Sequence, residues 1–256
     1  MEILSEIQIK EKIINSFTDD QPLFYVESGS RLWRMASPNS DYDIRGFHIE
    51  SKDKYFDYKP HRDLKEIMDG DFDFVSYSID KMFSLISNSN PTALEWLRSD
   101  IVYYNQLKEW DSFKSQVLEN INYLSLFGHY ASLSRNNFKL IEEGKKITYK
   151  TALYCIRGIV SAKVSLKEII PQLIIDDLFN QVEKDQLIDI AYLCLEKKKL
   201  SEEKTDIEDV LKDKVIKSIK NALDYLAEIE FKTESKKDKL SNILTEYSIQ
   251  VKQNYY

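Results

Sequence analysis

A motif near the start of the chain limits its possible folds more than any other feature. The apolar run Leu23–Glu27 is followed by Gly29 and Ser30, and a ten-residue spacer then leads to Asp41 and Asp43. The apolar run predicts a buried strand that ends at the glycine. The alternating segment around Asp43 predicts a second strand. Since side chains alternate between the faces of a strand, the two aspartates should point the same way.

Two carboxylates on one face repel each other, so they need either solvent or a cation beside them. The second strand is expected over Tyr42–Ile49 and a third over Phe72–Tyr77, where Asp73 can add another carboxylate if the third strand lies beside the second. Magnesium favours oxygen ligands, usually one or two carboxylates together with substrate phosphates. Three acids suit two-ion phosphoryl transfer, whereas an ordinary solvated pair is the simpler alternative.

The glycine and serine suit a phosphate loop. Gly29 would let the backbone approach a phosphate closely. A helical turn that begins at Ser30 would direct free N–H groups toward that phosphate, and Arg31 would add a forked, charged donor. The alternative is an ordinary turn after a strand.

Helix signals follow the third strand. Ser78 is a good N-cap for a helix over Ile79–Ile86. The pair Asn90-Pro91 predicts a second helix start, with proline at the first helical position. A final short strand is expected over Ile101–Tyr104.

From about residue 106 the chain follows helical periodicity. One long helix is expected from the region of Trp110 to Glu143, ending at Gly144, and another from Thr148 to about Glu168. The lysine-rich run 197–204 predicts a solvated turn between helices. We therefore expect an α+β fold, with a small mixed sheet and flanking helices over 1–105 and an all-helical domain over 106–256.

Composition excludes several classes of protein. The net charge of −7 argues against a broad electrostatic footprint on nucleic acid, although local contact with one RNA end stays open. No apolar run approaches a membrane span, and the first residues lack the pattern of a signal peptide. Cys155 and Cys194 have no metal-ligand neighbours in the sequence, so we expect two buried free thiols in a cytoplasmic protein.

The combined pattern resembles the DNA polymerase β-type nucleotidyltransferase superfamily. More narrowly, ESGSRLWRMASPNSDYDIRG resembles the YcgL/RlaP-like family of predicted nucleotidyltransferases, which is associated with RNA repair. The similarity continues through the segment that contains Glu-Trp-Leu and through a later Lys-x-x-x-Tyr-x-x-Arg helix. It covers about residues 25–180.

The resemblance implies roles for individual residues. Asp41 and Asp43 would bind two Mg²⁺ ions, with Mn²⁺ as a possible replacement. Asp73 would bind the catalytic ion and help to deprotonate the nucleophile, and Asp71, which shares its face, is the alternative for this role. The triphosphate of an NTP would be held by Gly29, Ser30, Arg31 and Ser40.

Three residues of the helical half are further candidates. Lys150, Tyr154 and Arg157 share one face of a helix. Spacing alone favours a solvated helix edge. The resemblance instead implies that Lys150 and Arg157 meet the triphosphate and that Tyr154 contacts the nucleotide, so that the helical domain completes the nucleotide site.

Two positions depart from the family pattern. Arg34 stands where the family usually has glycine, and Ser78 stands where it often has an acid. The implied activity is Mg²⁺-dependent transfer of an NMP from an NTP to a hydroxyl or phosphate acceptor, with release of pyrophosphate. The acceptor stays open among an RNA end, a tRNA, a protein and a small molecule. The alternative is a nucleotide-binding regulatory module with little or no turnover.

Overall fold

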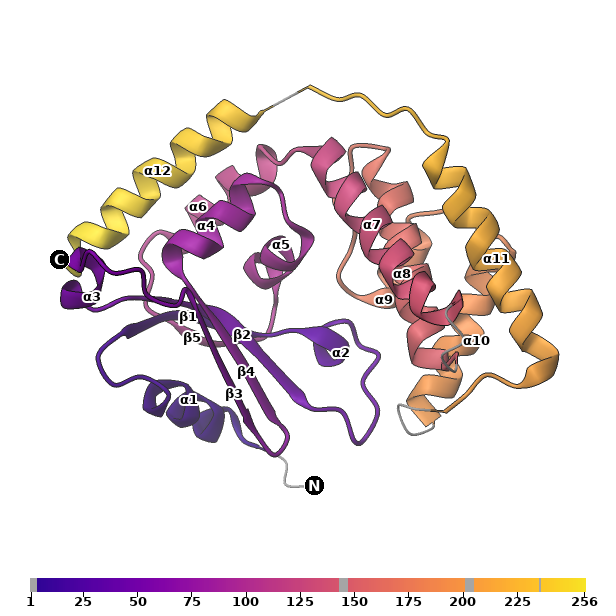
Figure 1. The fold of residues 1–256 in the computed structure, drawn as a ribbon, viewed down its shortest axis with the longest axis horizontal. Helices are drawn as coiled ribbons and strands as arrows, with labels where there is room; N and C mark the ends of the chain where they lie inside the picture. Colours follow the sequence, from indigo (N-terminus) through magenta and orange to yellow (C-terminus); the bar gives the residue numbers. More distant parts are fainter. Residues whose placement is uncertain (1–3, 143–146, 201–204, 235) are drawn as a thin grey trace. The chain divides into compact units, whose positions relative to one another are not determined.

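The computed structural model describes residues 4–142, 147–200, 205–234 and 236–256, and Figure 1 labels its elements. The strands are β1 (Gln21–Glu27), β2 (Tyr42–Ile49), β3 (Leu64–Asp69), β4 (Phe72–Ser78) and β5 (Val102–Asn105). The helices are α1 (Glu6–Asn15), α2 (Gly29–Leu32), α3 (Lys52–Phe56), α4 (Ile79–Ser87), α5 (Pro91–Arg98), α6 (Trp110–Glu119), α7 (Tyr123–Glu142), α8 (Tyr149–Ser165), α9 (Ile175–Asn180), α10 (Gln186–Leu200), α11 (Asp209–Ala227) and α12 (Lys237–Gln253).

The strands form one mixed sheet in the order β3-β4-β2-β1-β5. β2 and β4 run parallel, and the other neighbours run antiparallel. The four predicted strands are confirmed as β1, β2, β4 and β5 to within a residue or two. β3 has no counterpart among the predictions, because it lies at the edge of the sheet and buries little of its side-chain surface.

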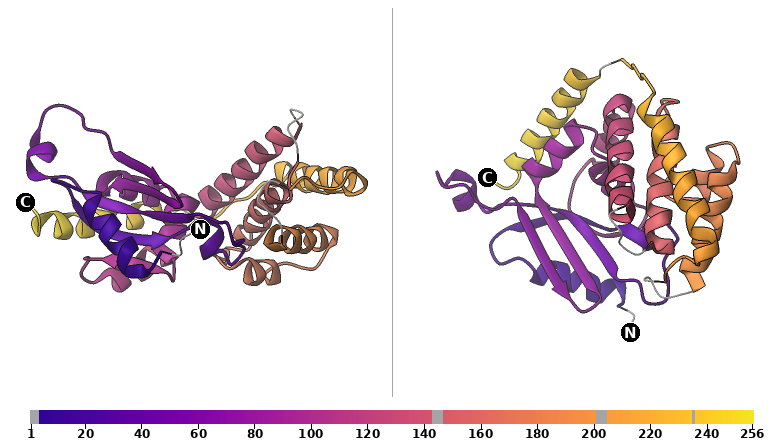
Figure 2. Two further views of the ribbon diagram at one scale, coloured as in Figure 1. Left: turned by 90° about the horizontal axis from the view of Figure 1, so that it is seen from below. Right: turned by 45° about the vertical axis from the view of Figure 1, so that its right-hand side comes forward.

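The two faces of the sheet carry different cores. Helix α1 packs against β1 and β5, and α4 packs against β2 and β4 (Figure 1, Figure 2). Ile13, Ile44 and Phe74 belong to the core under α1. On the other face, Phe47 contacts the rings of Phe24, Phe83 and Trp110. Because strand side chains alternate, Asp43 shares the face of Phe47 but lies at the opposite end of β2.

The single long helix expected from the Trp110 region is wrong. The chain leaves helical geometry at Asn120, where α6 ends and α7 has not begun. Asn120 Nδ2 donates to the carbonyl of Gln116, and the N–H of Asn122 donates to the hydroxyl of Ser89 instead of a helix carbonyl. The two helices therefore meet at a break where a side chain outside them accepts a backbone N–H. The expected end at Gly144 lies outside the described residues.

The chain divides into two compact units that interleave along the sequence. One contains the described residues of Met1–Leu32, Asp41–Asn122 and Ser235–Tyr256, and the other those of Trp33–Ser40 and Tyr123–Glu234. The first holds the sheet and the second is built from helices, which confirms the predicted α+β class. The domain division at residue 105 stays a prediction. In the structure, α6 and α12 belong to the same unit as the sheet.

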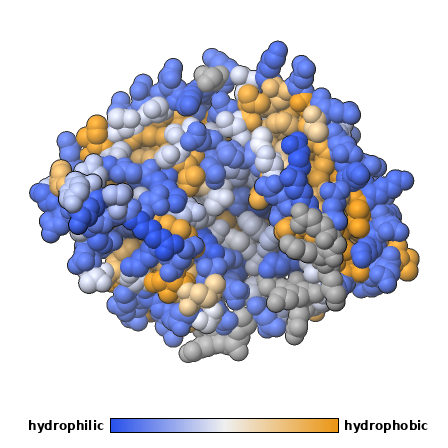
Figure 3. Space-filling model, viewed as in Figure 1, coloured by the Kyte–Doolittle hydropathy of each residue, from blue (hydrophilic) through white to orange (hydrophobic). Residues whose placement is uncertain are grey.

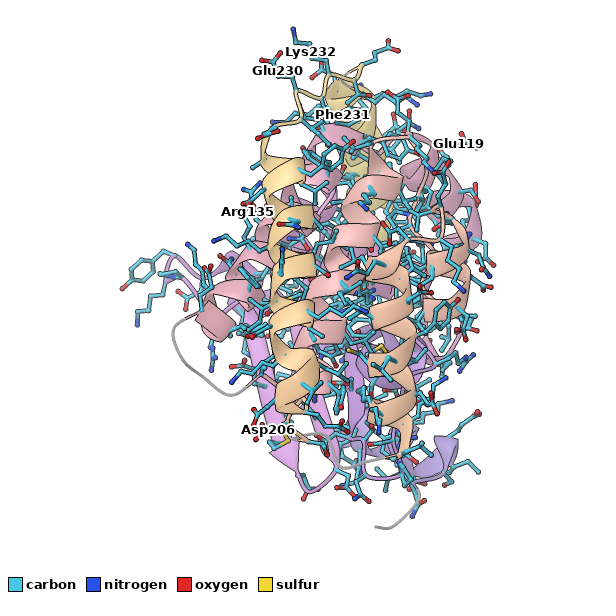
Figure 4. The ribbon with its side chains drawn as sticks, turned by 90° about the vertical axis from the view of Figure 1, so that its right-hand side faces the viewer. Glu119, Arg135, Asp206, Glu230, Phe231 and Lys232 are labelled. Atoms are coloured by element: carbon cyan, nitrogen blue, oxygen red, sulfur yellow. The ribbon has the colours of Figure 1, made fainter. Side chains whose placement is uncertain are left out.

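Helix α8 is the central helix of the second unit. Almost all of its residues between Ala152 and Ser165 are buried, and it packs closely against α7 and α10. Figure 4 shows Asp206, which precedes α11, and Phe231, which follows it, at opposite ends of this unit. Phe231 packs edge-on against Phe127 of α7.

Cys155 and Cys194 are free and buried, as predicted, and burial raises the pKa of each thiol to about 12. Across the part of the chain that the structure describes, no helix combines the length and apolar character needed to cross a membrane. On the face drawn in Figure 3, hydrophilic residues predominate and hydrophobic side chains gather in separate patches.

Candidate active site

Two acids meet where β2 and β4 run side by side. The parallel register pairs Asp43 directly with Asp73, one residue inside the start of each strand. Like charges directly opposite one another destabilise a sheet unless a cation lies between them. Phe72 and Phe74 are buried on one face of β4, and the alternation of the strand leaves Asp73 half-buried on the other face. The sheet therefore brings together two of the three predicted metal-binding acids.

The Gly29 turn lies against this pair. The N–H of Ser28 donates to the carbonyl of Asp43 at 2.9 Å. Gly29 has φ +59°, and a β-carbon added to it would overlap Oδ2 of Asp43. Only glycine meets both conditions, because other residues pay for left-handed geometry and carry that carbon. Ser30 follows in the short helix α2 and is buried, so the predicted phosphate loop borders the carboxylate pair.

Arg45 lies between the two carboxylates, and the sequence analysis did not single it out. Its Nη2 donates to Asp43 Oδ1 at 2.8 Å and to Asp73 Oδ2 at 2.7 Å. Its Nη1 donates to Asp73 Oδ1 at 3.1 Å and to the Asp73 carbonyl at 2.6 Å. The position two residues after Asp43, on the same strand face, is the signal that could have found it.

Glu27 is the second residue that sequence reasoning missed. It is fully buried at the end of β1, where Oε1 accepts the N–H of Asp43 at 2.9 Å and Oε2 accepts the hydroxyl of Tyr103 at 2.7 Å. Burial raises its pKa to about 7, although both hydrogen bonds act in the opposite direction. Glu27 thus fixes the backbone at the start of β2. A charged residue at the end of an apolar run was the available signal.

Asp41 and Arg31 lie beside the pair. Asp41 is exposed and precedes β2 by one residue. Its carbonyl accepts Nε of Arg31 at 3.0 Å, and the Arg31 guanidinium lies 3.9 Å from the centre of the Tyr42 ring. Arg31 is therefore held at the edge of the site by the backbone and a ring. The role of Asp41 as a third metal ligand stays a prediction.

The other predicted site residues belong to the helical unit. Ser40 Oγ accepts the N–H of Ser37 at 2.9 Å, which closes the end of the spacer loop Trp33–Ser40. On α8, the Arg157 guanidinium lies 3.7 Å from the centre of the Trp33 ring, and Tyr154 packs edge-on against that ring. Lys150 Nζ lies 5.8 Å from the centre of the Tyr154 ring. Arg157 is only 5% exposed, so the expectation of a solvated helix edge does not describe it.

The spacer loop has two further supports. Lys198 of α10 is 1% exposed and donates to the carbonyl of Met35 at 2.6 Å. The solvated turn predicted for 197–204 is therefore wrong at Lys198, and residues 201–204 lie outside the described part. The N–H of Ile175 donates to the carbonyl of Trp33 at 3.1 Å. Arg34, which lies between Trp33 and Met35 in the sequence, has φ +59° and an exposed side chain. This left-handed backbone explains why glycine suits the position.

The donor set fits a magnesium ion. No cluster of three or more His, Cys, Asp or Glu residues with metal-binding geometry occurs among the described residues. Magnesium does not need one, because in nucleotide enzymes it usually takes one or two carboxylates and completes its shell with water and phosphates. Asp43 and Asp73 provide two carboxylates that already converge on a cationic group.

Comparisons with known proteins show which family the chain belongs to. The paired strand carboxylates and the Gly-Ser turn, taken with the family match, indicate a polymerase-β-like nucleotidyltransferase. The chain belongs to the RNA repair pathway DNA polymerase beta family (RlaP), whose model matches residues 1–249. This confirms the resemblance noted from the motif.

Individual relatives share 30% sequence identity or less with this chain. The chain is 27% identical to the protein YcgL of Bacillus subtilis (strain 168) over 227 residues, which cover 87% of each chain. It is 30% identical to the protein MJ0002 of Methanocaldococcus jannaschii over 141 residues, or 54% of this chain and 57% of the relative. A solved nucleotidyltransferase-like protein from Exiguobacterium sibiricum 255-15 aligns with 98% of this chain and 80% of its own, at a TM-score of 0.32 and 14% identity.

Proposed function

We propose that this protein is a divalent-cation-dependent nucleotidyltransferase that moves an NMP from an NTP to an acceptor and releases pyrophosphate. The observation that carries the proposal is the in-register pair of Asp43 and Asp73, with the Gly29 turn packed against Asp43. A glycine turn lets the backbone approach a phosphate closely, and two convergent carboxylates suit a metal ion bound to that phosphate. Membership of the family supports the same activity.

In the proposed reaction, an acceptor oxygen attacks the α-phosphorus of the NTP and forms the new P–O bond. The bond between the α-phosphorus and the bridging oxygen breaks, and pyrophosphate leaves with the electron pair. Mg²⁺ or Mn²⁺, held by Asp43 and Asp73 and by Asp41 if the predicted triad forms, would supply charge neutralisation for the phosphates. Asp73 is the proposed acceptor of the proton from the attacking hydroxyl.

Other residues have proposed roles in nucleotide binding. Gly29, Ser30 and Arg31 lie along the turn beside the carboxylates and are suited to hold the triphosphate. Ser40, Lys150, Tyr154 and Arg157 stay candidates from the resemblance, and alanine at Lys150 or Arg157 should raise the KM for NTP. An unchanged KM for both variants would remove them from the site.

The acceptor is open to experiment. The family name associates its members with RNA repair, which favours an RNA end or a tRNA. The net charge of −7 favours contact with one end rather than a long footprint. A protein or small-molecule acceptor is tested by the same assay, and a cytoplasmic location stays a prediction.

The test is incubation with NTPs labelled at the α-phosphate, with Mg²⁺ or Mn²⁺, and with separate pools of RNA, protein and small molecules. We expect label in one pool from α-labelled NTP and none from γ-labelled NTP. Nucleotide-dependent thermal stabilisation without transfer to any pool would instead support the regulatory module. The absence of both would contradict the enzyme and the module. The two departures from the family pattern are the observation behind the module: Ser78 caps α4 and Arg34 has an exposed side chain, and the same assay decides whether turnover survives them.

A further inference from the structure

Arg45 is more buried and makes more hydrogen bonds than an exposed surface ion pair does. Its side chain is 15% exposed, whereas those of Asp43 and Asp73 are 26% and 25% exposed. One terminal nitrogen serves both carboxylates. The other donates to the carbonyls of Ile44 and Asp73 as well as to Asp73 Oδ1. The fork of the guanidinium is therefore aligned by the main chain as well as by charge.

This geometry places a positive charge on the oxygens that a metal ion would need. Asp43 Oδ1 and both carboxylate oxygens of Asp73 accept hydrogen bonds from Arg45. The remaining oxygen of the pair, Asp43 Oδ2, faces Gly29. Because both oxygens of Asp73 already accept hydrogen bonds from Arg45, a divalent cation that binds both carboxylates must share at least one oxygen with Arg45. It must also approach a fixed positive charge.

We propose that Arg45 is an internal counter-ion that holds Asp43 and Asp73 together before a metal ion binds and that competes with the metal for them. The inference rests on the proposed function, since it assumes that these carboxylates bind a divalent cation. Arg45 is then a positioning residue that lowers the affinity for the metal alone. A purely structural role, in which Arg45 only keeps the carboxylates in place, would have the opposite effect on affinity.

The sign of the effect separates the two roles. Arg45→Gln removes the competing charge and leaves the carboxylates to repel each other, so both changes favour metal binding. We expect Arg45→Gln to bind Mn²⁺ about 10-fold more tightly than the wild type. If Arg45 were only a scaffold for the acids, its removal would weaken binding.

The experiment titrates the full-length protein with MnCl₂ in the absence of nucleotide and measures free Mn²⁺ by electron paramagnetic resonance. The variants are Arg45→Gln, Arg45→Lys and Asp43→Asn. Arg62→Gln is the matched control, because it removes the same charge from an exposed pair with Glu66 in the same unit. We expect wild-type affinity for Arg62→Gln and lost binding for Asp43→Asn.

Stability gives a second measurement that does not depend on activity. Without metal, Arg45→Gln should have a lower Tm than the wild type, and Mn²⁺ should raise its Tm more than that of the wild type. If Arg45→Gln does not fold, Arg45→Lys replaces it: the compact ammonium cannot reach all the acceptors at once, so its Mn²⁺ affinity should also exceed the wild-type value.

The failures are distinguishable. Equal or weaker Mn²⁺ binding by the folded Arg45 variants overturns this inference, and so does the absence of binding by every variant. If the wild type binds and Asp43→Asn binds equally well, the metal lies elsewhere and the proposed catalytic site is wrong. If the separate assay shows transfer of α-label but the Arg45 variants bind Mn²⁺ no more tightly than the wild type, the proposed enzyme activity still holds and only the counter-ion role is excluded.

Discussion

The motif that runs from Gly29 to Asp43 is stabilised in one way at its two ends and in another way in its middle. At the ends, the Gly29 turn and Asp43 are held by neighbouring strands and by Arg45, all within the sheet unit. The middle, Trp33–Ser40, packs in the helical unit, where Arg157 lies on Trp33 and Lys198 donates to the Met35 carbonyl. A single continuous motif therefore depends on local sheet register at its ends and on partners more than 120 residues away in its middle.

The largest effect should come from the turn at the end of the motif. Gly29→Ala adds a methyl group that overlaps Asp43 Oδ2 and also strains a left-handed backbone. We expect about 1–2 kcal/mol of strain, a further 1–3 kcal/mol from overpacking, and roughly 100-fold lower nucleotidyl transfer. Urea unfolding and the α-label assay measure these effects.

Gly70→Ala is the matched control for Gly29→Ala. Gly70 has φ +58°, but a methyl group there would meet nothing within 4 Å. The free energy of unfolding of Gly70→Ala should therefore fall only by the backbone strain, and the variant should keep full activity. If both variants lost the same stability and Gly29→Ala stayed active, the close contact between the turn and Asp43 would not matter.

The sheet unit should also respond to pH through His48. Burial lowers the pKa of His48 to about 4 from its ordinary 6.5, and Nδ1 lies 2.7 Å from Ser76 Oγ. The unfolded chain therefore binds this proton at a higher pH, and the contribution of His48 to stability should fall as the pH drops from about 6.5 to about 4, by up to roughly 3 kcal/mol. Glu27, whose pKa is raised to about 7, acts in the opposite direction. In urea unfolding, the stability of the wild type relative to His48→Gln should therefore fall as the pH drops across this range. Parallel curves would contradict this assignment.

A smaller effect is expected where the loop meets the helical unit. Lys198→Met removes the donor to the buried Met35 carbonyl, which should cost about 1–3 kcal/mol. Hydrogen exchange at the amides of residues 33–40 should become faster. The neighbouring exposed Lys199→Met is the control and should change neither quantity. Unchanged exchange in Lys198→Met would show that the loop does not depend on this contact.

The smallest effect should be a gain. Arg34 has a left-handed backbone and an exposed side chain, so Arg34→Gly should raise the free energy of unfolding by about 1 kcal/mol. Arg34→Ala keeps the strain and should bring no such gain. If glycine failed to stabilise, contacts of the Arg34 side chain would outweigh the strain of its backbone.

The sequence predicted best where structure depends on near neighbours. The four strands that contain Phe24, Asp43, Phe74 and Tyr103 follow from a local apolar run, from local alternation and from turn residues. The Ser78 cap follows from its own helix. Asp43 and Asp73 both lie near the start of predicted strands, but their pairing also requires β2 and β4 to be adjacent and parallel, which no local pattern showed. Local patterns thus predicted most of the strands in the sheet unit.

Contacts between distant residues were not predictable in the same way. Where the expected long helix breaks, Ser89 accepts the N–H of Asn122, and no local pattern marks that partner. The burial of Lys198 is hidden by a lysine-rich run that looks solvated. Glu27 and Arg45 were missed because each forms its contacts only after the strands have paired.

The central claim is that Asp43 and Asp73 form the catalytic pair. The most direct measurement compares the transfer rate of α-labelled NMP by the wild type with the rates of Asp43→Asn, Asp73→Asn and Asp71→Asn, all confirmed as folded. Asp71 lies just before β4 and is not paired with Asp43 in the register. We predict losses of about 100-fold or more for Asp43→Asn and Asp73→Asn, and near wild-type rates for Asp71→Asn. Normal transfer by either of the first two variants, or an equal loss in Asp71→Asn, would contradict the account.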